Sequence, residues 1–122
     1  MATPLLTALI AELRSELKAR NTELAGQFSP DVSVTPLLRS RCLAVDSALQ
    51  RLWSHFDLDE TGATLAAVGG YGRGELFPES DIDVLILVAN ERAPDTAALS
   101  GFISALWDLG LKIGPSVRTP DE

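Results

Sequence analysis

The sequence predicts one α/β domain, in which two helices precede a strand, a turn, a second strand, a third helix and a last strand. Three observations predict this order. Apolar residues recur at helical spacing over two stretches of the first half. Two short apolar runs flank a glycine-rich segment at 69–74. The second run is apolar in both alternating positions, which is typical of a central strand covered on both sides.

Two helices are expected in the first half of the chain. Thr3-Pro4 resembles a cap followed by proline in the first turn, and Thr35-Pro36 repeats this signal. Between them, the polar stretch 21–31 contains glycine and proline and predicts a connection. The apolar stripe of the first helix consists of Leu6, Leu9, Ile10, Leu13 and Leu17. That of the second consists of Leu38, Cys42, Val45, Leu49, Leu52 and Phe56, and a turn at 57–62 ends this helix.

The strands and a third helix are expected in the second half. Residues 64–68 and 81–88 predict two strands, and Pro94-Asp95 precedes the third helix. That helix carries Leu99, Phe102, Ile103 and Leu106. Leu111, Ile113 and Val117 indicate a last strand, which Gly114-Pro115 is expected to interrupt. We divide the chain into an N-terminal helix with its connection, 1–34, and a main domain, 35–122.

Composition excludes several classes of function. The 122 residues carry a net charge of −7, which argues against a nucleic-acid surface because phosphate backbones require clustered Lys and Arg. Cys42 is the single cysteine, so no intrachain disulfide forms. The start lacks a basic region, and 5–11 is too short to span a bilayer. We expect a cytoplasmic protein with no membrane partner.

Asp81 and Asp83 stand at the start of the second predicted strand. Strand residues two apart point to the same face, which places these carboxylates roughly 6–7 Å apart at their Cα atoms. Two like charges this close repel unless a cation lies between them. Divalent cations bind oxygen ligands and bridge phosphates. The pair therefore predicts a magnesium site for a nucleoside triphosphate, although exposed Asp-x-Asp pairs more often serve only as surface polar residues.

The glycine-rich segment allows close approach of a phosphate. Gly69, Gly70, Gly72 and Gly74 match neither the dinucleotide fingerprint nor the Walker phosphate loop. For the glycines alone, a tight turn that binds nothing explains the pattern equally well. Arg73 is a candidate for phosphate contact or for neutralising a neighbouring acid. Ser80 is a candidate for capping the turn or for orienting the metal site, and capping is the preferred interpretation.

Residues 69–76, Gly-Gly-Tyr-Gly-Arg-Gly-Glu-Leu, followed by Ser80-Asp81-Ile82-Asp83, resemble a known family. This is the nucleotidyltransferase domain of the bacterial PII uridylyltransferase/uridylyl-removing enzymes, within the DNA polymerase-β-like superfamily. The resemblance extends to both sides, over 37–53 and 106–119. It implies a polymerase-β-like core, with a small mixed sheet flanked by helices and preceded by N-terminal helices.

The resemblance also implies an activity. It is the transfer of UMP from UTP to a tyrosine of the nitrogen-regulatory protein PII, with release of pyrophosphate. By position, Asp81 and Asp83 become catalytic residues that bind two magnesium ions. Gly69 and Gly70 would hold the triphosphate, and Arg73 and Ser80 complete the candidate nucleotide contacts.

Two departures from the superfamily pattern affect this expectation. Tyr71 stands where superfamily members commonly have serine. The third carboxylate of the superfamily has no clear position here, because Asp108 is expected at a helix end and 121–122 at a terminus. We therefore expect an N-terminal fragment or a short relative, weakly active or inactive alone.

Two alternatives remain at this point: an adenylyltransferase of the same superfamily, and a non-catalytic regulatory module that keeps the fold. Outside the site, His55 is not expected to bind metal, Cys42 is expected to be a buried small hydrophobic residue, and Trp53 and Trp107 are expected to pack. Arg118 is expected either to approach the nucleotide or to form a salt bridge.

Overall fold

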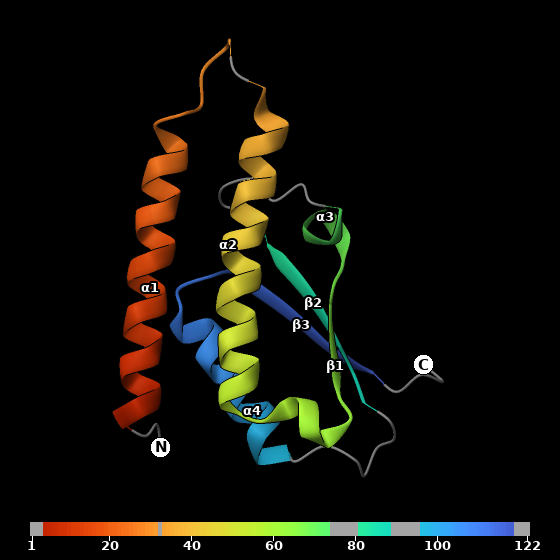
Figure 1. The fold of residues 1–122 in the computed structure, drawn as a ribbon. Coiled ribbons are helices and arrows are strands. Elements are labelled where there is room, and N and C mark those ends of the chain that lie inside the picture. The colour runs from red at the N-terminus through yellow and green to blue at the C-terminus, as the bar shows by residue number, and fades with distance from the viewer. Residues whose placement is uncertain (1–3, 32, 74–80, 89–95, 119–122) are drawn as a thin grey trace.

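The computed structural model describes residues 4–31, 33–73, 81–88 and 96–118 (Figure 1). In these ranges the elements follow the predicted order. They are α1 (Pro4–Ala25), α2 (Val34–His55), the 3-10 helix η1 (Leu58–Thr61), β1 (Thr64–Ala67), α3 (Gly69–Gly72), β2 (Ile82–Leu87), α4 (Thr96–Asp108) and β3 (Ile113–Arg118). Thr3, Ser80 and Pro94-Asp95 lie outside the described residues.

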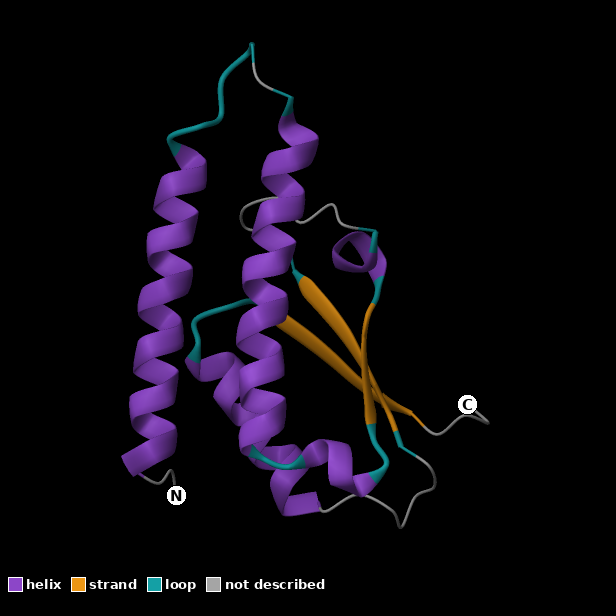
Figure 2. Cartoon of the chain, in the orientation of Figure 1, coloured by secondary structure: helices purple, strands orange, loops and turns teal. Residues whose placement is uncertain are grey.

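The three strands form one small mixed sheet with the order β1-β2-β3. β1 pairs antiparallel with β2, and β2 pairs parallel with β3. The prediction that β2 is the central strand is therefore confirmed. The helices lie beside one face of this sheet, and α1 packs against the outer side of α2 (Figure 2). This is the mixed sheet with flanking helices that the resemblance implied.

Helix α1 is longer than predicted. It continues through Ala25, although 21–31 was expected to be a connection. No glycine or proline occurs between residues 5 and 25, and Leu24 is only 5% exposed, so its burial favours another helical turn. Arg51 of α2 pairs with Glu12 and Glu16 of α1 at 3.1 and 3.2 Å.

Helix α2 begins at Val34 with Ser33 as its N-cap, so the prediction of Thr35 as the cap is wrong. Pro36 is nevertheless tolerated, because the first backbone N–H groups of a helix have no partner within it. The predicted apolar face is confirmed, and its members Leu38, Cys42, Val45, Leu49 and Leu52 are all buried. Phe56 lies just beyond the helix end and packs against the core.

Burial alternates strictly along β2. Ile82, Val84 and Ile86 are buried on the helix side, whereas Asp83, Leu85 and Leu87 are half-buried on the other. The expectation that both faces are covered is therefore wrong for the described residues, where helices cover one face. The half-buried leucines explain why the run is apolar in both positions.

Strand β3 is continuous, so the expected interruption at Gly114-Pro115 does not occur. Ile82 and Val88 donate backbone hydrogen bonds to the carbonyls of Lys112 and Arg118, at 2.7 and 2.9 Å. The even-numbered residues of β3 thus bond to β2, and Pro115 belongs to the alternate set that faces the outer edge. An edge position tolerates proline because no hydrogen bond is lost.

The two tryptophans differ in burial. Trp53 is buried as predicted and meets Phe102 edge to face, with ring centroids 5.2 Å apart. Trp107 is 57% exposed, so the prediction that it packs is wrong for most of its surface. It lies on the side of α4 away from Phe102 and donates its Nε1–H to the carbonyl of Ile113 at 3.4 Å.

Leu13 and Leu17 of α1 belong to the same buried cluster as Ile82, Val84 and Ile86 of β2. The division of the chain at residue 34 stays a prediction. None of the described helices combines the length and the apolar composition needed to cross a bilayer.

Candidate active site

Asp83 is held by a backbone hydrogen bond to the β1 side and lies beside Gly114 in the register with β3. Its carbonyl accepts a hydrogen bond from the Val68 N–H at 3.1 Å, at the end of β1. On the other side, its register partner in the parallel ladder is Gly114 of β3. These contacts fix the start of β2 between the glycine turn and β3.

The Asp83 carboxylate lies between two glycines. A β-carbon built on Gly69 would lie 2.9 Å from Asp83 Oδ2, and one built on Gly114 would lie 2.8 Å from Oδ1. Both distances are shorter than carbon and oxygen normally allow. The absence of side chains at both positions therefore creates the space that the carboxylate occupies. Gly69 also has φ +63°, a conformation that favours glycine.

Asp81 is exposed, one residue before β2. The burial pattern of Asp81 (exposed), Ile82 (buried) and Asp83 (half-buried) places the two acids on the same side of the sheet, away from the helices. No group of three or more His, Cys, Asp and Glu residues gathers within 4–31, 33–73, 81–88 and 96–118. Two carboxylates nevertheless fit magnesium, which is commonly bound by one or two acids with water and substrate phosphates.

The glycine turn is a single helical turn directly after β1. Arg73 ends it, and the Arg73 N–H donates to the carbonyls of Gly69 and Gly70 at 3.1 and 3.2 Å. Gly69 and Arg73 are exposed, whereas Gly70 is half-buried. The structure thus brings Gly69 next to Asp83. The predicted contribution of Ser80 lies outside the described residues.

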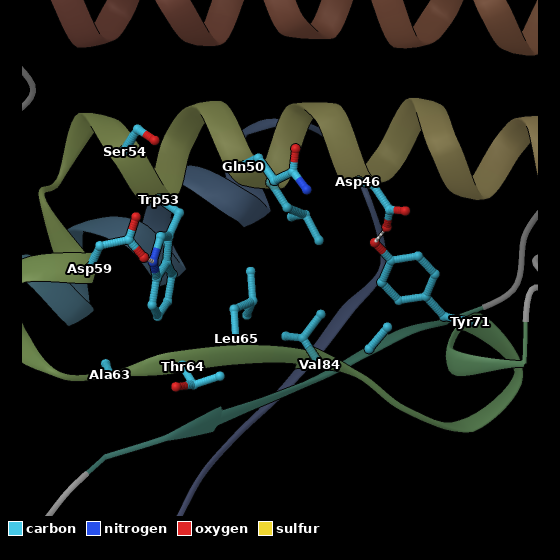
Figure 3. Close-up of a pocket in the computed structure, with 12 residues that line it drawn as sticks. Asp46, Gln50, Trp53, Ser54, Asp59, Ala63, Thr64, Leu65, Tyr71 and Val84 are labelled. Carbon is cyan, nitrogen blue, oxygen red and sulfur yellow. Dashed lines mark hydrogen bonds between the residues drawn. The ribbon is translucent and has the colours of Figure 1, made fainter.

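Tyr71 points from this turn toward Asp46 of α2 (Figure 3). Its hydroxyl donates a hydrogen bond to Asp46 Oδ1, and only 5% of the residue is exposed. The Cys42 thiol donates a weak bond to the Tyr71 carbonyl at 3.9 Å. Burial and the adjacent Asp46 carboxylate raise the pKa of the Tyr71 hydroxyl well above its ordinary value.

Sequence reasoning missed Asp46. Its partner is 25 residues away in the chain, and Asp46 follows the helical pattern of α2 as an ordinary polar residue. The sequence carries no local signal for this contact. The available hint was Tyr71 itself, because a tyrosine inside a glycine turn requires a partner for its hydroxyl wherever it is buried.

A cavity lies between α2 and β1, on the helix side of the sheet (Figure 3). Tyr71 and Asp46 stand at one end of it. Trp53 and Asp59 stand at the other, where the Trp53 Nε1–H donates to Asp59 Oδ1 at 2.7 Å. Val84 lines its wall, and Asp83 points to the opposite face of β2. This cavity is therefore separate from the paired acids.

The remaining predicted residues lie away from the acids. Asp108 ends α4, as expected, and its carbonyl accepts a hydrogen bond from Arg14 at 3.2 Å. His55 ends α2, is exposed and packs against Phe56. Arg118 pairs in register with Leu87, at the end of β2 remote from Asp83.

Comparison with known protein families matches residues 46–122 to the family described as "Nucleotidyltransferase domain". The chain is also similar to bacterial proteins named bifunctional uridylyltransferase/uridylyl-removing enzyme. It is 45% identical over 115 residues to the protein of Pseudomonas putida and 48% identical over 115 residues to that of Cupriavidus metallidurans. Each alignment covers 93% of this chain and 13% of the relative, so the chain spans about an eighth of these proteins. No solved structure gives a significant match.

Proposed function

This chain belongs to the nucleotidyltransferase domain family, and on that premise we propose that it transfers UMP from UTP to a tyrosine of the PII signalling protein. In this reaction the tyrosine oxygen forms a bond to the α-phosphorus of UTP. The bond from that phosphorus to the bridging oxygen breaks, pyrophosphate leaves, and the tyrosine proton is released. Uridylyl transfer is supported by the names of the relatives. PII, the tyrosine acceptor and a cytoplasmic location rest on the resemblance of the motif.

One observation carries the proposal: the Asp83 carboxylate lies against Gly69 of the glycine turn, and Asp81 is on the same side of the sheet. An anionic carboxylate and a loop without side chains are thus adjacent. This arrangement suits a polyphosphate only when positive charge is supplied between them. Asp81 and Asp83 would hold two magnesium ions, which when bound neutralise phosphate charge and orient the reacting groups.

The other residues have subsidiary roles in this proposal. Gly69 and Gly70 allow the triphosphate to approach the backbone closely, because no side chain lies in the way. Arg73, exposed at the end of the turn, is proposed to contact a phosphate, and Ser80 to order the segment before Asp81. The Tyr71 side chain is directed to Asp46 of α2, so it is not proposed to contact the nucleotide.

The test is Asp83→Asn, which keeps the shape of the side chain and removes its charge. UTP and ATP are titrated calorimetrically with magnesium into the chain, and transfer of label from UTP to PII is followed in the full gene product. We expect wild type to bind UTP in preference to ATP. We expect Asp83→Asn to lose transfer by at least a hundredfold, since electrostatic stabilisation is usually a dominant contribution.

Asp31→Asn is the matched control, because Asp31 is exposed in the connection between α1 and α2. It should behave like wild type. Preferential binding of ATP would favour an adenylyltransferase. A biological effect that survives Asp83→Asn would favour a non-catalytic module and would overturn the proposal.

A further inference from the structure

We propose that Gly114 is a positioning residue for Asp83: its missing side chain leaves the space on β3 in which the carboxylate lies. The inference rests on the proposed function, because it assigns a role to Gly114 through the metal-binding acid. Gly114 is 31 positions from Asp83 and belongs to no part of the glycine-rich motif.

The pairing of β2 with β3 places Gly114 directly beside Asp83. Asp83 and Gly114 are paired residues of β2 and β3, so their side-chain positions project from the same face of the sheet. Paired side chains on neighbouring strands lie in direct contact. Any side chain at 114 would therefore occupy the same space as the Asp83 carboxylate.

The space around the Asp83 carboxylate is too small for an added β-carbon at either glycine. A β-carbon on Gly114 would lie 2.8 Å from Asp83 Oδ1, and a β-carbon on Gly69 would lie 2.9 Å from Oδ2. An added methyl group at 114 would therefore force the carboxylate to move from its present position. A displaced carboxylate would bind a cation less well, because magnesium demands near-ideal ligand geometry.

Gly69 and Gly114 differ in backbone conformation. Gly69 has φ +63°, so a substitution there combines backbone strain with the clash. Gly114 is not among the glycines with positive φ, so alanine suits its backbone. A strand glycine is also less favourable than alanine in the absence of other effects. Gly114→Ala therefore tests the space around Asp83 with little other disturbance.

The experiment measures Mn²⁺ binding, by the electron paramagnetic resonance of free Mn²⁺, in the wild-type chain and in three variants. These are Gly114→Ala, Gly26→Ala and Asp83→Asn. We expect Gly114→Ala to weaken Mn²⁺ binding at least tenfold and to raise the metal concentration that gives half-maximal transfer. Gly26→Ala is the matched control, because a β-carbon there meets its nearest atom at an ordinary 3.5 Å.

The outcomes separate the two proposals. If the wild-type chain binds no Mn²⁺, or if Asp83→Asn binds Mn²⁺ as tightly as wild type, the proposed metal site is overturned. If Asp83→Asn abolishes binding and Gly114→Ala leaves it unchanged, only the role of Gly114 is overturned.

A second variant keeps the test valid if Gly114→Ala does not fold. The Gly114→Ala and Asp83→Ala double variant removes the carboxylate that the new methyl group meets. Recovery of folding, measured by circular dichroism and thermal unfolding, supports the contact with Asp83. A double variant that stays as unstable as Gly114→Ala overturns it.

Discussion

At the scale of single residues, Tyr71 connects the glycine turn to the helical layer. Its hydroxyl is buried against Asp46 of α2, and its backbone belongs to the turn that places Gly69 beside Asp83. A hydrogen bond to a charged group contributes about 1.5–3 kcal/mol to stability. The side chain therefore anchors the turn from the side opposite to the acids.

Tyr71→Phe should lower the free energy of unfolding by about 1–3 kcal/mol at neutral pH, because Asp46 loses a buried partner. The measurement is urea unfolding. Leu5→Ala serves as a control, since Leu5 is 77% exposed and should contribute little. Equal stability of Tyr71→Phe and wild type would show that the bond to Asp46 is not formed in solution.

The raised pKa of Tyr71 predicts a loss of stability at high pH. The unfolded tyrosine releases its proton near pH 10, whereas the folded one retains it, so the unfolded state binds fewer protons. The contribution is fully present below pH about 10 and declines above it, by at most about 1.4 kcal/mol per pH unit. Tyr71 is the single tyrosine of the chain, so tyrosinate absorbance reports its titration directly. A midpoint near the ordinary value would contradict the prediction.

At the scale of secondary-structure elements, α4 joins the sheet to α2 through one face. Phe102 is fully buried and meets Trp53 at an interplanar angle of 84°. Trp107 lies on the same helix and is largely exposed. Two aromatic residues five positions apart thus have opposite environments, because helical periodicity turns one toward the core and the other away.

Phe102→Ala should therefore destabilise the chain by about 3–5 kcal/mol, through lost burial and the cavity left behind. Trp107→Ala is the comparison on the same helix and should cost much less, about 1 kcal/mol or below. Circular dichroism during urea unfolding measures both, since fluorescence changes when tryptophan is removed. Equal losses for the two variants would contradict the packing of α4 described above.

At the scale of the whole molecule, the net charge bears on the proposed metal site. The chain carries a net charge of −7, and two of its acids share one side of the sheet. A polyphosphate approaching this face meets like charge unless metal ions accompany it. Nucleotide and metal should therefore bind together more tightly than either binds alone.

Magnesium with UTP should raise the unfolding temperature of wild type more than the sum of the two separate additions. A ligand at 100 times its dissociation constant stabilises by about 2.7 kcal/mol. Asp81→Asn should lose this gain, whereas Arg51→Ala should keep it while losing its exposed pairs to Glu12 and Glu16. Differential scanning calorimetry measures the effect, and independent additive shifts would contradict coupled binding.

The sequence by itself determined the element order, the central position of β2 and the placement of Asp81 and Asp83 at its start. These features follow from local periodicity and from the motif, which depend on neighbouring residues. Tertiary context overrode two local signals: α1 continued to Ala25, and β3 passed through Pro115, where the edge position costs no hydrogen bond.

The tertiary structure alone decided which distant residues meet. The sequence does not indicate that Asp46 accepts the bond of Tyr71, that Gly114 stands opposite Asp83 or that Trp107 faces outward. Each depends on the register between strands or on the angle between a helix and the sheet. Those are set by the summed packing of the core, so no single stretch of sequence specifies them.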